Sequence, residues 1–296
     1  MSLWLGIDCG GTNTKVLLGE REGGELVLRS RERFPTPRHP EALVEVGHRV
    51  RSFLDGQVPV GFGIAVPGII DASGTVLTST NLPWLEGATP AMALAEAVGA
   101  PGVVLHDGAA AAQAEVTLGA ARGEPDAFII ALGTGVAGAH VVDGRIRRGS
   151  HGGAGEIGHV SLGGDRLCSC GQRGCLETAI GGRQLARQWQ ETLGVADRTA
   201  KDLVEAVRAG DLRARGLLEA GTSALARGVL AMVALLDPGI IVIGGGLATA
   251  ADLVIAPTAE KVAGLATFHQ VPPIVPAALG SWAAAWGALL AARASA

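Results

Sequence analysis

Residues 3–14 read LWLGIDCGGTNT, an apolar run that ends in an acid and continues into a pair of glycines. A second apolar stretch, KVLLG at 15–19, follows at once, and a Glu/Gly-rich turn at 20–25 leads into an extended run at 26–31. Short apolar runs separated by turn residues are typical of strands. The sequence therefore predicts strand, tight turn, strand, turn, strand at the start of the chain.

The same plan recurs near the middle of the chain. FIIAL at 128–132 runs into GTG at 133–135, and a strand-like run at 137–142 precedes a second extended segment at 145–148. Two copies of a unit that opens on a Gly/Thr turn predict an α/β protein with two similar domains facing a cleft. We place a small domain at 1–115 and a large domain at 116–280.

The remaining elements follow from periodicity and turn signals. Strands are predicted at 60–66, 102–106 and 240–243, and helices at 41–54, 90–98, 108–121, in much of 177–236 and at 281–293. The last helix carries Trp282 and Trp286 one turn apart, a spacing that predicts core packing. We expect this C-terminal segment, 281–296, to pack back on the small domain.

Composition and charge narrow the class of protein. The chain has 296 residues, 48% of them hydrophobic, and a formal net charge of −4, which is ample for a large buried core. A mildly acidic chain without a block of like charge is not expected to bind nucleic acid. The longest uncharged apolar runs, 228–236 and 282–292, reach about half of the ~20 residues that a membrane span needs. No basic segment followed by an apolar stretch opens the chain, so we expect a cytoplasmic protein with no membrane partner.

The glycine turns suggest phosphate binding, because glycine lets backbone N–H groups approach an anion. A Walker A loop is excluded, since none of the three lysines, at 15, 201 and 261, stands in a Gly-Lys-Ser/Thr sequence. GTGVAG at 133–138 matches a dinucleotide fingerprint, but a strand-like run follows it where that motif requires a helix. Two phosphate-binding hairpin turns remain, with ordinary glycine hairpins as the alternative. Asp8 beside a phosphate predicts Mg²⁺ between them, bound directly or through water.

One imidazole and three thiols gather within a short segment. His159, Cys168, Cys170 and Cys175 supply four ligands that suit tetrahedral Zn²⁺, and a site filled by four protein ligands is structural. Reduced thiols without metal are the alternative. Asp107 follows the apolar run 103–105 and begins an alanine-rich helix, so from the residues alone it could be an N-cap.

Several of these segments resemble the ROK family of bacterial sugar kinases and related repressors. They are GIDCGGT at 6–12, VPG at 66–68, GTG at 133–135, and 155–177 from GEIGH to CLE. The resemblance extends over nearly the whole chain. It implies two ribonuclease H-like domains flanking a cleft, as in actin-like ATPases, and a homodimer or homotetramer.

The resemblance also implies roles for individual residues. Asp107 corresponds to the base that accepts the proton of the phosphorylated hydroxyl. The predicted sugar ligands are Gly68, Asn81, His106, Asp107, Glu156, His159 and Glu177. The predicted nucleotide ligands are Asp8, Gly10, Gly11, Thr12, Asn13, Thr14, Gly133, Thr134 and Gly135, with Gly244, Gly245 and Gly246 near adenine. Because Glu156 and Glu177 flank the zinc ligands, zinc is expected to hold both in position.

One departure from the family pattern bears on the substrate. ROK sugar kinases usually carry Asn immediately before the catalytic Asp and again two places after it, where this chain has His106 and Ala109. We predict an ATP-dependent hexokinase of carbohydrate metabolism and glycolysis, with glucose to glucose 6-phosphate favoured. N-acetylglucosamine, N-acetylmannosamine, mannose and fructose stay open as substrates, as does a non-catalytic sugar-binding protein. A repressor of the family needs an N-terminal DNA-binding extension, whereas the first phosphate turn here begins by residue 8.

Overall fold

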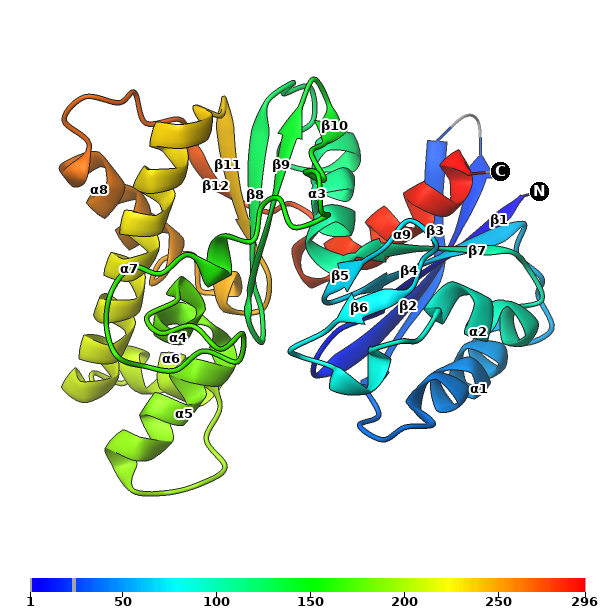
Figure 1. The fold of residues 1–296 in the computed structure, drawn as a ribbon, viewed down its shortest axis with the longest axis horizontal. Coiled ribbons are helices and arrows are strands. Elements are labelled where there is room, and N and C mark those ends of the chain that lie inside the picture. The colour runs from blue at the N-terminus through cyan, green and yellow to red at the C-terminus, as the bar shows by residue number, and fades with distance from the viewer. Residues whose placement is uncertain (1, 23–24, 296) are drawn as a thin grey trace. The chain divides into compact units, whose positions relative to one another are not determined.

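The structure is a computed structural model that describes residues 2–22 and 25–295 (Figure 1). The chain forms two compact units. Unit 1 comprises Met1–Ala114, Arg148–Gly153 and Trp282–Ala296, and unit 2 comprises Glu115–Arg147 and Ala154–Ser281. The chain therefore enters unit 1 three times, and the short return at Arg148–Gly153 had no signal in the sequence.

Unit 1 is built on a five-stranded sheet in the order β3-β2-β1-β4-β7. The strands are β1 (Leu3–Cys9), β2 (Asn13–Glu22), β3 (Glu25–Pro35), β4 (Gly61–Val66) and β7 (Gly102–His106). The first three are antiparallel neighbours, whereas β1, β4 and β7 run parallel. The predicted strands of this region are confirmed, and a small ribbon of β5 (Ile69–Ile70) and β6 (Val76–Thr78) with the 3₁₀ turn η1 (Pro83–Leu85) is added.

The alternation of side chains along β1 and β4 divides the unit 1 core between two faces. Leu5 and Ile7 pack with Val46 of α1 (Ala42–Leu54) and with α2 (Pro90–Val98). The other face of the sheet carries α9 (Ala283–Ala294), with Trp4 and Leu17 in its cluster and Trp282 and Trp286 packed against it. Figure 1 shows α9 on one side of the sheet and α1 and α2 on the other. The predicted packing role of the two tryptophans is confirmed.

Glycine allows α9 to approach this sheet closely. A Cβ on Gly63 would lie 2.0 Å from the carbonyl oxygen of Ala288, and one on Gly6 would lie 2.1 Å from that of Ala285. Contacts this short with backbone atoms cannot be relieved by a side-chain rotation. Only glycine at these strand positions permits the observed spacing.

Gly63→Ala is expected to lower the free energy of unfolding by about 3 kcal/mol or more, because α9 must shift away from the sheet. The measurement is urea denaturation followed by circular dichroism. Gly216→Ala is the matched control, because that glycine lies in a helix with no atom within 4 Å of the added Cβ. It should raise stability by about 0.5–1 kcal/mol. Equal stability of Gly63→Ala and wild type would contradict the close packing.

Unit 2 repeats the plan of unit 1. Its sheet has the order β10-β9-β8-β11-β12, with β8 (Ala127–Leu132), β9 (Val136–Val142), β10 (Arg145–Ile146), β11 (Ile240–Gly244) and β12 (Ile274–Pro276). Three consecutive antiparallel strands are again followed by two parallel ones. The prediction of an α/β protein with two similar domains is thereby confirmed.

The helices of unit 2 pack on its sheet around one hydrophobic core. They are α4 (Leu176–Ile180), α5 (Gly182–Leu193), α6 (Ala200–Arg208), α7 (Leu212–Leu236) and α8 (Ile255–Leu265), with short 3₁₀ turns η2 (Ile157–His159) and η3 (Leu247–Thr249). A further turn, η4 (Gly280–Trp282), spans the point in the chain where unit 2 ends and the last segment of unit 1 begins. By length and composition α7 could cross a membrane, but 56% of its most apolar window is buried inside the structure. Burial of that extent is typical of a core helix.

A buried carboxylate ties α3 (Asp107–Leu118) to the segment before η4. Glu115 is 1% exposed. Its Oε2 accepts hydrogen bonds from the N–H groups of Ala120 (2.8 Å) and Ala278 (3.1 Å), and its Oε1 accepts one from Leu279 (2.9 Å). Three backbone donors compensate the cost of burying the charge. Glu115 could not be singled out from the sequence, since two of its donors, Ala278 and Leu279, lie far along the chain.

Glu115→Gln is expected to lower the free energy of unfolding by about 3 kcal/mol, because an amide NH₂ cannot accept the hydrogen bonds that one carboxylate oxygen receives. Thermal or urea unfolding measures the loss. Glu96→Gln removes a charge at an exposed position of α2 and should leave stability within about 0.5 kcal/mol of wild type. Equal stability of the two variants would show that the Glu115 contacts are not stabilising.

Candidate functional site

Three of the predicted site segments meet at one edge of the unit 1 sheet. Asp8 pairs in register with Ala65 of the parallel strand β4, and Val66 of β4 pairs with His106 at the end of β7. Neighbouring parallel strands end at the same edge. The structure therefore places Asp8, the loop after β4 and Asp107 together, although they are far apart in the sequence.

Asp8 is buried and forms an ion pair with Lys15. The Nζ of Lys15 donates to Oδ2 of Asp8 at 2.7 Å, and the two residues face each other across β1 and β2. Burial raises the pKa of Asp8, the Lys15 ammonium opposes this rise, and the carboxylate of Asp107 adds to it. A further cation beside Asp8 would stabilise its negatively charged form. Lys15 was not among the predicted site residues.

The turn that follows β1 is stabilised by residues that come directly after β3. The N–H of Gly10 donates to the carbonyl of Asn13 at 3.2 Å. The hydroxyl of Thr36 donates to the carbonyl of Gly10 at 2.7 Å and lies 3.0 Å from the hydroxyl of Thr14. Arg38 donates to the carbonyl of Gly11 at 3.1 Å. These contacts fix the turn and bring a guanidinium to it, which the sequence analysis did not identify.

Asp107 is the first residue of α3, directly after the last residue of β7. Its Oδ1 accepts a hydrogen bond from the N–H of Gly108 at 2.7 Å and lies 3.2 Å from Nε2 of His106. The side chain is 28% exposed. The first contact satisfies one of the open N–H groups at the helix start, and the exposed part of the carboxylate remains accessible to a ligand.

The loops that carry Gly68 and Asn81 are adjacent in unit 1. Gly68 has φ +120°, and a Cβ there would lie 2.1 Å from the carbonyl oxygen of Thr78. Ser79 lies two residues before Asn81, and its hydroxyl donates to the carbonyl of Pro67 at 2.8 Å. The two predicted sugar-binding loops are thus held to each other by the Ser79 hydroxyl and by the close approach of their backbones.

In unit 2 the two predicted nucleotide-binding glycine segments, 133–135 and 244–246, also lie close together. Gly133 and Gly135 form the turn between β8 and β9, closed by a 3.0 Å hydrogen bond from the N–H of Gly133 to the carbonyl of Gly135. Gly245 has φ +95°, and a Cβ there would lie 2.4 Å from the carbonyl oxygen of Leu132, the residue before the turn. The predicted nucleotide segments 133–135 and 244–246 therefore share the carboxyl ends of the parallel strands β8 and β11.

Glu177 links this turn to the Cys/His segment. Its Oε2 accepts a hydrogen bond from the N–H of Val136 at 2.8 Å, and the residue is 6% exposed. The start of α5 closes on the same turn, because Gly182 and Arg183 donate to the carbonyls of Gly133 and Thr134 at 3.0 and 2.9 Å. One acid thus contacts the backbone that follows the predicted phosphate turn.

The predicted metal ligands come together in unit 2. Each residue of the group offers one ligand atom, a ring nitrogen of His159 or the Sγ of Cys168, Cys170 or Cys175. These four atoms lie within 4.8 Å of one another. Cys168 Sγ lies 3.6 Å from His159 Nδ1, and Cys170 Sγ lies 3.6 Å from Cys175 Sγ. A zinc tetrahedron with bonds of about 2.3 Å has edges of about 3.8 Å. The donor set and its spacing fit Zn²⁺.

Each of the two predicted sugar acids is adjacent to an element that carries a metal ligand. Glu156 precedes η2, which ends at His159. Cys175 is the N-cap residue of α4, in which Glu177 is the second residue. Burial and the neighbouring thiols raise the pKa of Cys175 to about 12, so a bound cation is what would favour its thiolate. Cys9, the fourth cysteine, is a buried thiol of unit 1.

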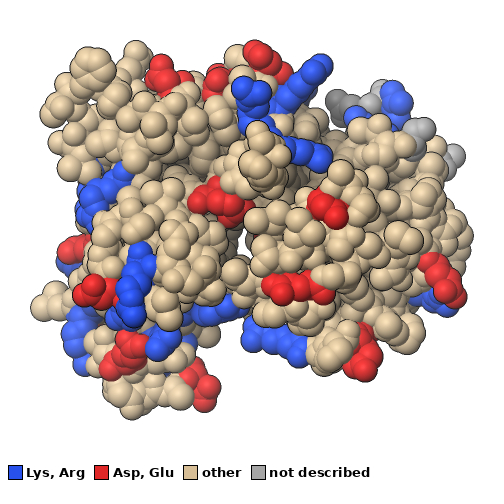
Figure 2. Space-filling view, viewed as in Figure 1, with Lys and Arg blue, Asp and Glu red and all other residues tan. Residues whose placement is uncertain are grey.

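The surface shows no concentration of one charge on the face drawn in Figure 2, where acidic and basic side chains are interspersed.

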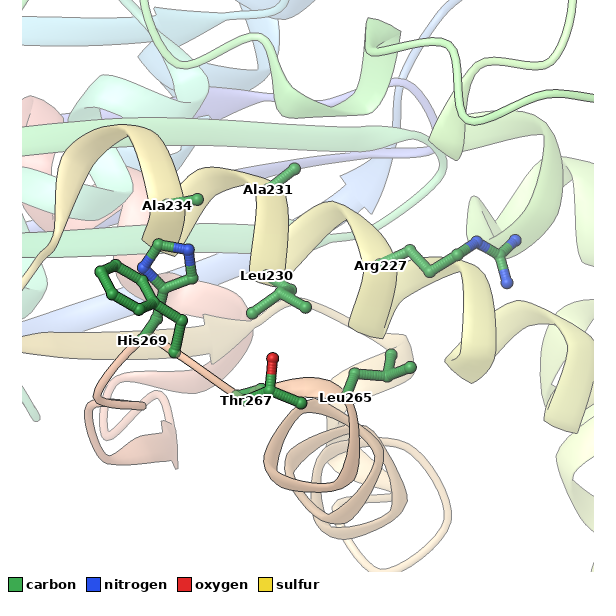
Figure 3. Close-up of a pocket in the computed structure, with 9 residues that line it drawn as sticks. Arg227, Leu230, Ala231, Ala234, Leu265, Thr267 and His269 are labelled. Atoms are coloured by element: carbon green, nitrogen blue, oxygen red, sulfur yellow. The ribbon is translucent and has the colours of Figure 1, made fainter.

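A cavity of about 450 Å³ opens on unit 2 beside α7 and the segment after α8 (Figure 3). It is lined by Arg227, Leu230, Ala231, Ala234, Leu265, Ala266, Thr267, Phe268 and His269. In the described part of the chain, none of the predicted sugar, nucleotide or metal residues lines this cavity.

Comparison with known proteins identifies the family. The model of the ROK family matches residues 4–295. The chain belongs to the ROK family. A glucokinase of Streptomyces coelicolor is 31% identical over 99% of this chain and 98% of its own length. A kanosamine kinase of Amycolatopsis mediterranei is 33% identical over 96% of this chain and 94% of its own length.

Solved structures show that this ROK protein has the fold of ROK sugar kinases, an actin-like ATPase fold. A ROK family glucokinase from Streptomyces griseus, in complex with glucose and AMPPNP, is 28% identical and covers 99% of this chain and 100% of that chain, with a TM-score of 0.87. The predicted family and fold class are confirmed.

Proposed function

We propose that this ROK protein is an ATP-dependent hexose kinase that phosphorylates the 6-hydroxyl of glucose. The observation that carries the proposal is the placement of Asp107 at the same sheet edge as Asp8 and its glycine turn. A kinase needs a carboxylate to accept the hydroxyl proton and a backbone cradle for the phosphates, and unit 1 offers both. The sequence similarity to a glucokinase over the whole chain supports the choice of sugar.

In the proposed reaction Asp107 accepts the proton of the attacking hydroxyl while the γ-phosphoryl group leaves ADP. Residues of unit 1 that hold the sugar are Gly68 and Asn81. Glu156, Glu177 and His159 of unit 2 accept or donate hydrogen bonds to its other hydroxyls. Carboxylates suit this purpose because each can accept bonds from adjacent hydroxyl groups.

The nucleotide is proposed to use the turns of both units. Backbone N–H groups at 10–14 and 133–135 bind phosphate oxygens, and 244–246 lies toward adenine. Mg²⁺ is proposed to bind beside Asp8, where it would add to the compensation that Lys15 already gives the buried carboxylate. When bound with ATP, Mg²⁺ neutralises charge on the phosphates. Lys15 keeps Asp8 oriented through its 2.7 Å contact.

Zinc is proposed as a structural ion held by His159, Cys168, Cys170 and Cys175. It would fix η2 and the start of α4, and thereby Glu156 and Glu177. The Nδ1 of His159 faces Cys168, so the other ring nitrogen is the one proposed to meet a sugar hydroxyl.

Two assays test the proposed function: a coupled assay for ADP release when ATP is the donor, and a coupled assay for sugar phosphate formation when polyphosphate is the donor. Glucose, mannose, fructose, N-acetylglucosamine, N-acetylmannosamine and kanosamine are offered as acceptors. We expect the highest kcat/KM for glucose with ATP. A higher value for an amino sugar would reassign the substrate within the kinase class, and no turnover with any sugar would contradict the kinase.

A non-catalytic sugar-binding protein is the second candidate, favoured by His106 and Ala109 at positions where ROK kinases usually have Asn. Isothermal titration with glucose separates the two candidates. Binding of glucose without turnover would support the second candidate, and binding with turnover supports the first.

A further inference from the structure

His106 and Asp107 form a contact between consecutive side chains. Such neighbours usually point away from each other in a strand, because side chains alternate between its faces. Here β7 ends at His106 and α3 begins at Asp107, and this change of conformation lets both side chains turn to the same side. Nε2 of His106 lies 3.2 Å from Oδ1 of Asp107.

Two groups contact the same oxygen of the Asp107 carboxylate. Oδ1 accepts the N–H of Gly108 at 2.7 Å and lies within hydrogen-bonding distance of His106 Nε2. A carboxylate is planar, so the hydrogen bond from Gly108 and the close contact with the imidazole, both at Oδ1, together restrict the direction in which Oδ2 points. His106 can supply its donor in the neutral tautomer that carries hydrogen on Nε2, as well as in the charged form.

The orientation of Oδ2 matters because Asp107 is the proposed base. The acceptor hydroxyl must lie within about 2.6–3.2 Å of the base, and a misplacement of about 1 Å can cost a hundredfold in rate. Asp8 is a charged group near this carboxylate and repels it, and Lys15 pairs with Asp8. The contact of His106 with Oδ1 opposes a rotation of Asp107 away from Asp8.

We infer that His106 is a positioning residue, which orients the proton-accepting oxygen of Asp107 instead of binding the sugar. The inference rests on the proposed kinase function and revises the sugar-binding role that the family resemblance implies for this position. The side chain of His106 is 21% exposed, so most of its surface is occupied by protein contacts.

The test compares His106→Ala with His106→Gln, whose amide NH₂ can stand near the place of the imidazole Nε2. For His106→Ala we expect kcat for glucose to fall by about tenfold or more while KM for glucose changes by less than about threefold. His106→Gln should recover most of the lost kcat. A rise of KM by about tenfold or more with unchanged kcat in His106→Ala would assign His106 to the sugar and overturn the inference, as would the absence of recovery in His106→Gln.

Calorimetric titration with glucose separates this test from the test of the kinase function. Glucose should bind His106→Ala with a Kd within about threefold of wild type. Lost binding would overturn the inference whether or not the wild type turns over. If the wild type binds glucose but does not turn it over, the proposed kinase function is refuted. The comparison of Kd between His106→Ala and wild type still decides whether His106 binds the sugar. Thermal melting of each variant distinguishes a local effect from a failure to fold.

Discussion

Asp107→Asn is expected to lower kcat for glucose phosphorylation by about a thousandfold, whereas KM for glucose and for ATP should change by less than about threefold. Asn has nearly the same shape as Asp and can keep the hydrogen bond from the N–H of Gly108, but it cannot accept the hydroxyl proton. Steady-state kinetics with a coupled assay measure the loss. The loss should fall on the chemical step and leave glucose binding intact in a calorimetric titration.

A second substitution controls for the general effect of removing an acid. Asp252→Asn changes an exposed carboxylate of unit 2 that pairs with Arg208 at 3.4 Å on the surface. Its kinetic constants should equal those of wild type. If Asp107→Asn retained more than about a tenth of the wild-type kcat, Asp107 would not be the base, and its role would reduce to the start of α3.

Cys168→Ser is expected to release the proposed zinc ion and to lower Tm by about 10 °C or more. A serine hydroxyl is a poor zinc ligand, and the remaining three donors would hold the loop between η2 and α4 less firmly. Because Glu156 and Glu177 flank this loop, KM for glucose should rise by about tenfold as well. The measurements are metal content by mass spectrometry, calorimetric melting and steady-state kinetics.

Cys9→Ala is the matched control for the zinc experiment, because Cys9 is the one cysteine of the chain outside the cluster. It should keep one zinc ion per chain and a KM for glucose close to that of wild type. A wild-type protein that is purified without chelator and contains no zinc would contradict the metal site. Unchanged Tm in Cys168→Ser would show that the ion, if bound, does not support the loop.

The sequence predicted the strands and turns of both units because their signals are local. Asp8 and its glycines, for example, follow an apolar run within twelve residues. The contacts that hold the candidate site could not be predicted from the sequence, because they depend on strand register and on distant segments. Lys15 meets Asp8 through the β1–β2 pairing, Thr36 supports the turn from the end of β3, and Glu177 reaches Val136 across 41 positions.

The cluster of His159, Cys168, Cys170 and Cys175 could be predicted from the sequence for a different reason. Cysteine is rare in this chain, so three cysteines close to one histidine stand out without any knowledge of the fold. The contact between His106 and Asp107 could not be predicted, even though the residues are consecutive. It depends on the conversion of a strand into a helix between them, and the length of an element is less certain from sequence than its presence.

The packing of α9 on the unit 1 sheet has a consequence for biosynthesis. The strands of this sheet emerge early from the ribosome, whereas the helix that covers one of their faces is made only after all of unit 2. During that interval Trp4 and Leu17, which are buried against α9 in the finished structure, lack their native cover. Unit 1 therefore cannot complete its native packing until the last helix has been made, and its nascent sheet exposes apolar side chains during that interval.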